Sequence, residues 1–146
     1  MRRVSLLVVM VCFALSTAYA ADVKLDGIKC IMNAKADAKA DKAADYKGGK
    51  VYFCCDNCKG AFAKDEKKHA TKANTQLVAT GQAKQGKCPL SGGKLDKDTE
   101  ITVAGAKVQF CCNNCKGDVE KLKGDEQAEK VFGEDAFKKA DFKVSK

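Results

Sequence analysis

Cysteines are concentrated in two short stretches of the chain that differ at a single position. Residues 53–60 read FCCDNCKG, and residues 110–117 read FCCNNCKG. Sulfurs at such close spacing serve three kinds of chemistry: they bind a soft metal ion, they form disulfides that staple a small fold, or they act as a redox dithiol. The surrounding sequence has to distinguish among these three.

The two stretches belong to a longer internal repeat. Cys30 and Cys88 form a further matching pair at an offset of 58 residues, whereas the cysteines of the two stretches match at an offset of 57. One residue has therefore been gained or lost in the spacer of one copy. The candidate metal ligands divide evenly between the copies: Cys30, Cys54, Cys55 and Cys58 in the first, and Cys88, Cys111, Cys112 and Cys115 in the second.

The pattern around each cysteine stretch predicts a β-hairpin, a cysteine knuckle and a helix. Residues 101–110, ITVAGAKVQF, alternate apolar and polar side chains around a glycine-containing turn, which is typical of a hairpin. In the first copy we expect a two-residue turn at Gly48-Gly49 and a second strand over 50–53. Asp56 or Asn57, and their counterparts Asn113 or Asn114, offer N-caps for the helices that follow.

Helical segments are predicted beyond each knuckle. The first runs, with a break, over 57–78 and ends at Gly81, and the second ends at Gly124. Two further short helices around Gly133 are expected to dock through Val131, Phe132 and Phe137. The low-complexity segment 34–45 is predicted to be a polar loop, although its end aligns with a strand of the second copy. The expected division is a signal peptide over 1–20, a first module over 21–80, a linker over 81–86, a second module over 87–124 and a helical tail over 125–146.

A module of about 40 residues buries too little surface to fold without a cross-link. A bound Zn²⁺ contributes on the order of 10 kcal/mol, against roughly 2–4 kcal/mol for a disulfide. The spacing favours the metal, because Cys54 and Cys58 lie four residues apart at a strand-to-helix turn, where sulfurs surround one ion as in zinc knuckles. A helix N-terminus also favours the thiolate form that a metal needs.

Each copy resembles a YHS/TRASH-type module, in which one cysteine precedes a β-hairpin and an aromatic-Cys-x-x-x-Cys knuckle follows it. The residues that carry the resemblance are KC at 29–30 with YFCCDNCKGAF at 52–62, and KCPLSGGKL at 87–95 with VQFCCNNCKG at 108–117. The resemblance implies an α+β, treble-clef-like fold and a role in metal binding, buffering, sensing or trafficking. By motif position, it implies these ligands: Cys30, Cys54 and Cys58, then Cys88, Cys111 and Cys115.

The fourth thiol of each copy, Cys55 or Cys112, is either a fourth ligand or a spare thiol at the rim of the site. Thiolates select soft ions, so Zn²⁺ is the first expectation, with Cu(I) or another soft metal as the alternative. The implied partners are the ion itself and a metal-transport or sensor protein.

Two other functions compete with metal binding. Eight cysteines in an exported chain could instead staple an interaction module through disulfides. The Cys55-x-x-Cys58 pair could instead act in thiol–disulfide exchange, but no thioredoxin-like βαβ pattern surrounds it. The only histidine, His69, lies in a charged, solvated segment, and Met32 is expected to pack in the core. Because no acid–base pair is evident either, we do not expect an enzyme.

The first twenty residues have the parts of a secretory signal peptide. Arg2-Arg3 is a positive start, 4–15 is apolar, and AYA at 18–20 is a small-residue cleavage site. We expect cleavage near Ala20 and export to the periplasm or the cell exterior, with no membrane-spanning segment in the mature chain.

The mature chain would carry 25 lysines, no arginine and 19 acidic residues, for a net charge of +6. Because bidentate contacts to phosphate and guanine favour arginine, we expect no nucleic-acid partner.

Overall fold

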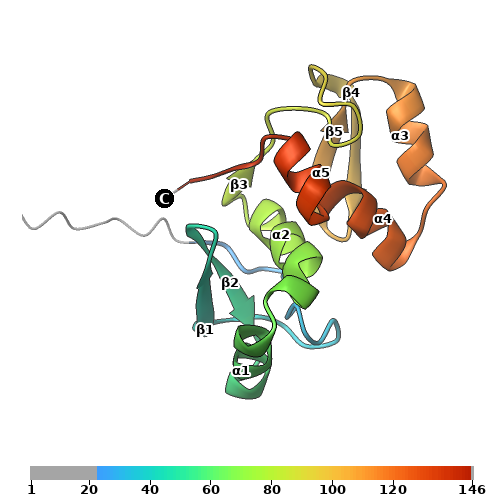
Figure 1. Ribbon diagram of the computed structural model, residues 1–146. Helices are drawn as coiled ribbons and strands as arrows, with labels where there is room; N and C mark the ends of the chain where they lie inside the picture. Colours follow the sequence, from blue (N-terminus) through green and yellow to red (C-terminus); the bar gives the residue numbers. More distant parts are fainter. Residues whose placement is uncertain (1–22, 146) are drawn as a thin grey trace, which may run out of the picture.

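The computed structural model describes residues 23–145, which form an α+β protein of two small treble-clef-like modules and a helical C-terminal region (Figure 1). Each module contains an antiparallel hairpin, a cysteine knuckle and a helix. The predicted signal peptide lies outside the described residues. The elements are β1 (Lys39–Tyr46), β2 (Gly49–Phe53), α1 (Asp56–Lys64), η1 (Lys67–His69), α2 (Ala70–Ala79), β3 (Ala83–Lys84), β4 (Asp96–Val103), β5 (Ala106–Phe110), α3 (Asn113–Glu120), α4 (Gly124–Phe132), α5 (Glu134–Lys139) and β6 (Lys143–Val144).

The first hairpin turns one residue earlier than the sequence predicts. Its loop is Lys47-Gly48, with φ values of 49° and 87°, so both central residues have the positive φ of a type I′ turn. The predicted turn at Gly48-Gly49 is therefore wrong. Gly49 starts β2 instead, and a Cβ on it would lie 2.8 Å from Leu77 Cδ2. Glycine is required there for close packing.

The two hairpins repeat each other in register as well as in sequence. Tyr46 pairs with Gly49 in the first hairpin, and Val103 pairs with Ala106 in the second. The long strand of each hairpin, β1 or β4, has a register shift at the same place, between 39 and 43 and between 96 and 101. The repeat therefore extends to the irregularity of the sheet.

The prediction of a polar loop over 34–45 is wrong for its second half, because β1 begins at Lys39. Its sequence, KADKAADY, is poor in the β-branched and aromatic residues that favour strands. Pairing with β2 overrides that propensity, since β2 is buried over Val51–Phe53 and needs a partner strand.

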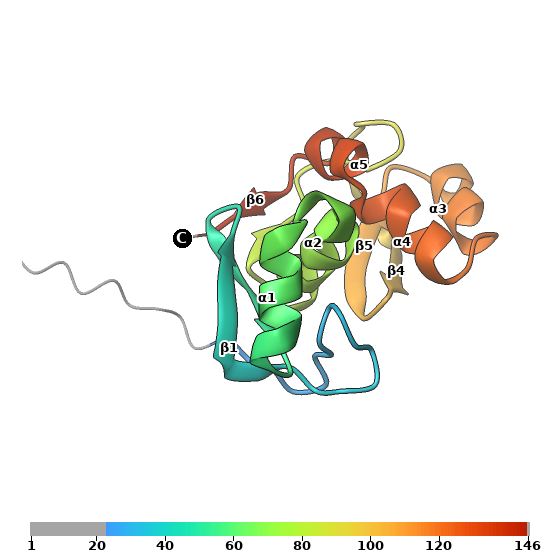
Figure 2. The same ribbon diagram turned by 60° about the horizontal axis from the view of Figure 1, so that its bottom comes forward.

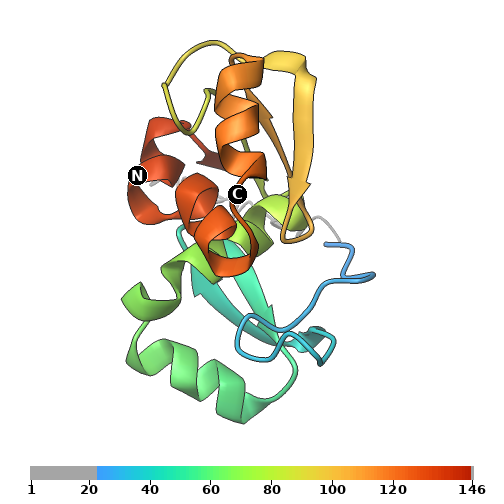
Figure 3. The ribbon, with the colours of Figure 1, turned by 90° about the vertical axis from the view of Figure 1, so that its right-hand side faces the viewer.

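The predicted helix over 57–78 is divided into α1, η1 and α2, and the chain turns sharply between α1 and α2 (Figure 2). Helix α2 ends before Gly81, whose φ of 73° suits a helix terminus. Leu77 of α2 is fully buried in the core of the first module, and its neighbour Val78 packs against the cores of both modules. Helix α2 therefore lies between the two hairpins (Figure 3).

The helical tail is confirmed and consists of α4 and α5 around Gly133. Val131 and Phe132 are buried in the core of the second module, whereas Phe137 is buried in the core of the first. The segment 81–86, which we expected to be a linker, contains β3, and β3 pairs with β6 at the C-terminal end. Among residues 23–145, no helix has the length and apolar character to cross a membrane.

Candidate metal centres

The structure brings three cysteines together in each module. In the first module they are Cys30, Cys54 and Cys58, and their sulfurs all lie within 4.8 Å of one another. The second module repeats this triad with Cys88, Cys111 and Cys115. Within the described part of the chain, these are the two groups of cysteine, histidine and acidic side chains close enough to share an ion.

Each knuckle supplies two sulfurs at the spacing of a metal site. Cys54 Sγ lies 3.6 Å from Cys58 Sγ, and Cys111 Sγ lies 3.7 Å from Cys115 Sγ. In a tetrahedral zinc site with Zn–S bonds of about 2.3 Å, neighbouring sulfurs lie about 3.8 Å apart. The thiol spacing and the softness of sulfur therefore fit a thiophilic ion in each module.

The third sulfur of each triad is buried and comes from a turn before the hairpin. Cys30 and Cys88 are 2% and 0% exposed. The Cys30 N–H donates to the Ala36 carbonyl at 3.0 Å, and the Cys88 N–H donates to the Gly93 carbonyl at 2.9 Å. The first turn is thus one residue longer than the second, which accounts for the change of offset from 58 to 57.

Cys55 and Cys112 lie beside the triads rather than within them. Each is 3.7 Å from the sulfur of the preceding cysteine, Cys54 or Cys111, but neither belongs to the set within 4.8 Å. They are the N-caps of α1 and α3, so the predicted caps at the Asp56-Asn57 and Asn113-Asn114 pairs are wrong by one or two residues.

Hydrogen bonds keep the pKa of the buried thiol of the second module near neutral. Burial raises the pKa of Cys88. Hydrogen bonds from the Ser91 hydroxyl and from the backbone N–H groups of Ser91 and Cys111 lower the pKa by more than burial raises it, so that it is about 7. Burial raises the pKa of Cys115 to about 12, and the Cys111 and Cys112 thiols raise it as well. Without a metal, the Cys88 thiol therefore ionises more readily than the Cys115 thiol.

The first module shows the same directions of pKa shift. Burial raises the pKa of Cys30, and backbone N–H groups of Cys54, Met32 and Asn33 outweigh it, so the pKa is lowered overall. Burial also raises the pKa of Cys58, as it does for its counterpart Cys115. No residue of the Cys30 turn takes the place of the Ser91 hydroxyl, which lies 3.1 Å from Cys111 Sγ in the second module.

The pKa values of the N-cap thiols Cys55 and Cys112 are lowered, whereas those of Cys58 and Cys115 are raised. The backbone N–H of Cys58 lowers the pKa of Cys55, and the Cys58 and Cys54 thiols lower it further. The backbone N–H of Cys115 does the same for Cys112. These N–H groups belong to the first helical turn, where the macrodipole favours a negative charge.

All eight described cysteines are free thiols. The shortest sulfur separations, 3.6–3.7 Å, are much longer than the bond of about 2.05 Å in a disulfide. His69 joins neither triad, and Met32 packs against the first core as expected.

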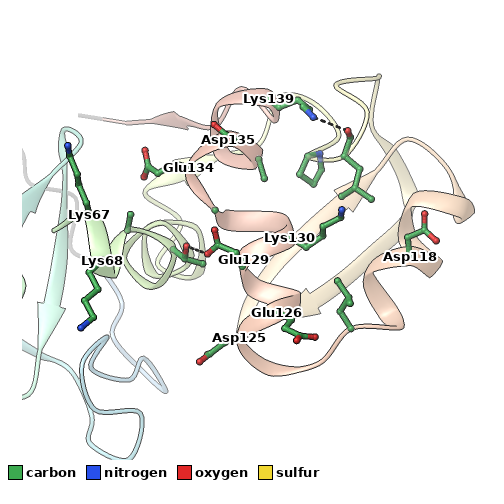
Figure 4. A pocket seen from close by; sticks show the side chains of 17 residues that line it. Lys67, Lys68, Asp118, Asp125, Glu126, Glu129, Lys130, Glu134, Asp135 and Lys139 are labelled. Atoms are coloured by element: carbon green, nitrogen blue, oxygen red, sulfur yellow. Dashed lines mark hydrogen bonds between the residues drawn. The ribbon is translucent and has the colours of Figure 1, made fainter. Parts of the chain in front are cut away.

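A large hollow lies on the described surface beside the helical tail (Figure 4). It is lined by charged side chains of η1, α4 and α5, and none of its lining residues is a cysteine. Hydrogen bonds cross it from Thr71 to Glu129 and from Lys139 Nζ to the Leu90 carbonyl at 3.3 Å. These contacts hold the helical tail against both modules.

Neither a family model, nor a curated protein, nor a solved structure matches this chain.

Proposed function

We propose that this is an exported metal-binding protein with two cysteine-thiolate sites, one in each module, and that it buffers, senses or carries a thiophilic ion. The observation that carries the proposal is the repeated triad, with three sulfurs within 4.8 Å of one another in each of the two copies. The resemblance of each copy to YHS/TRASH-type modules supports the same role. The protein is not an enzyme in this proposal, and its partner is a metal-transport or sensor protein.

Zn²⁺ is the proposed ion, and Cu(I) is the alternative. Zn²⁺ accepts thiolates at the observed spacing and stabilises small folds strongly. Thiolates select Cu(I) equally well, so binding has to be compared directly under reducing conditions.

Elemental analysis of the reduced, purified chain tests the proposal. We expect two ions per chain, and one ion in each of the variants Cys30→Ser and Cys88→Ser, because each removes the buried ligand of one triad. Counting free thiols in denaturant provides the control for the disulfide alternative. Fewer than about half an ion per module, together with fully oxidised thiols, would contradict metal binding and favour a stapled interaction module.

A further inference from the structure

The N-cap thiols lie next to the less buried thiols of each triad. Cys30 and Cys88 belong to the two hydrophobic cores, so no external donor reaches the triads from that side. The knuckle thiols Cys54 and Cys111 are half-buried, and they are followed by Cys55 and Cys112, which are half-buried and exposed, respectively. A thiol on a second molecule therefore meets Cys55 or Cys112 beside the ion.

The N-cap thiols are placed to reach a triad sulfur without a change of the backbone. They lie at the N-terminal ends of α1 and α3, next to the backbone N–H groups of Cys58 and Cys115. Each already lies 3.7 Å from one triad sulfur. A side-chain rotation, with no movement of the backbone, changes the distance of each N-cap sulfur from the ion.

We propose that Cys55 and Cys112 are exchange ligands, which bond to the ion only while it passes between a triad and an external thiolate. This inference rests on the proposed function. As the ion leaves, the N-cap thiol loses its proton and bonds to the ion, while one triad sulfur is released and takes up a proton. Incoming thiolates then replace the remaining protein sulfurs one at a time. Each incoming thiol loses a proton and each released cysteine takes one up, so no electrons are transferred.

The two copies differ in how open this route is. In the first copy Lys42 Nζ forms an ion pair of 2.9 Å with Asp56, the residue next to Cys55. At the matching positions the second copy has Asn113 and Thr99, and the Thr99 hydroxyl is buried against the backbone of Phe110. No such ion pair flanks Cys112, so we infer faster exchange at the second site.

Transfer of zinc from the loaded full-length chain to a chromogenic chelator, with glutathione added, tests this inference. We expect two kinetic phases. Cys112→Ser slows the fast phase and Cys55→Ser slows the slow phase, each by about tenfold or more, equivalent to about 1.4 kcal/mol in the barrier. Asn57→Ser and Asn114→Ser, which change exposed neighbours in the same helical turn, provide the matched controls and leave both phases in place.

A short Cys-x-x-Cys peptide in place of glutathione identifies the external thiolate. Acceleration by glutathione assigns small thiols as the acceptors, and acceleration by the peptide alone assigns a dithiol protein. Unchanged rates in both serine variants would overturn the inference.

A second result would also overturn it. If Cys55→Ser and Cys112→Ser weaken zinc binding by about 100-fold or more, these residues are permanent fourth ligands. If the wild-type chain binds no zinc, the proposed function itself fails, which is a distinguishable outcome.

Discussion

The Ser91 hydroxyl is the clearest chemical difference between the two triads. It lies in the turn that carries Cys88 and is within 3.1 Å of Cys111 Sγ, and it helps to lower the pKa of Cys88 to about 7. An unfolded cysteine has a pKa of about 8.5. Because the folded value is the lower one, ionisation of Cys88 stabilises the metal-free fold above pH 8.5, and that contribution is lost as pH falls through 7.

We therefore expect Ser91→Ala to destabilise the reduced, metal-free protein more at pH 9 than at pH 6. The hydroxyl supports the thiolate, and at pH 6 Cys88 is protonated. Urea unfolding at the two pH values, with a chelator and a reductant present, measures the difference. Ser145→Ala, at an exposed serine, is the control. An equal cost of Ser91→Ala at both pH values would show that the hydroxyl acts on packing rather than on the charge.

Gly49 provides a test of packing at the residue scale. A Cβ there would lie 2.8 Å from Leu77 Cδ2 and 2.9 Å from Val144 Cγ1. We expect Gly49→Ala to lower the free energy of unfolding by about 1–3 kcal/mol, which is typical of overpacking.

The matched control is Gly60→Ala, in the middle of α1, where a Cβ meets nothing within 4 Å. It should raise stability by about 0.5–1 kcal/mol through helix propensity. Equal effects of the two substitutions in urea unfolding would refute the packing argument.

At the scale of elements, glutamine side chains complete the outer edges of the hairpins. Gln76 of α2 accepts from Tyr52 N–H at 2.7 Å and donates to the Tyr52 carbonyl at 3.1 Å. Gln85 makes the same pair of bonds with Gln109, the residue that matches Tyr52 in the second copy. The edge of a two-stranded sheet exposes unpaired backbone N–H and C=O groups. The side-chain amides of Gln76 and Gln85 form hydrogen bonds with these groups.

We expect Gln76→Leu to destabilise the protein by about 2–4 kcal/mol, because it leaves buried backbone groups of Tyr52 and the Lys29 carbonyl without partners. Gln82→Leu is the control, because Gln82 caps Lys50 in the same way at an exposed position where water can substitute. Thermal unfolding of both variants gives the comparison. Similar losses at the two positions would mean that burial of these bonds is unimportant.

The sequence predicts the elements that depend on local pattern or on the repeat. The alternation over 101–110 and the knuckles are enough to predict both hairpins and the helices after them. The strand β1 could not be predicted from KADKAADY, because its stability comes from β2 rather than from its own residues. The glutamine contacts and β3–β6 pairing join residues far apart in sequence, for which one sequence without relatives gives no signal.

The candidate site was predictable to the same degree. The repeat and the spacing identified the eight cysteines, and the upstream turn brings Cys30 and Cys88 to the knuckles. Which knuckle thiol points inward depends on where the helix begins. The predicted caps placed that start too late, and the N-cap position of Cys55 and Cys112 sets them apart from the triads.

At the scale of the whole molecule, the two modules are joined by shared packing rather than by a flexible linker. Phe142 packs against both cores, and the Phe137 ring stacks on it with centroids 4.6 Å apart. Lys47 Nζ, in the first hairpin turn, lies 2.6 Å from Glu134 of α5. Asn74 of α2 donates to the Phe132 carbonyl at 2.8 Å. These contacts predict that the described residues unfold as one unit.

We expect Phe137→Ala to cost about 3–5 kcal/mol, as for other buried phenylalanines, and to lower hydrogen-exchange protection in both hairpins together. Lys138→Ala, at an exposed position of the same helix, should leave protection unchanged. Two separate unfolding transitions in the wild-type chain would contradict the single unit.

The hairpin register repeats at an offset of 57 through the strands, the turns and the strand irregularity, and the only change of offset falls in the turn that carries Cys30 or Cys88. In historical terms, this is the mark of a gene duplication in an ancestor that already had the complete hairpin. The two hairpins have since kept the same register, while the insertion or deletion occurred in the turn that carries the buried cysteine. The two copies have thus diverged in the turn of the buried cysteine while the hairpins that carry the knuckles kept one register.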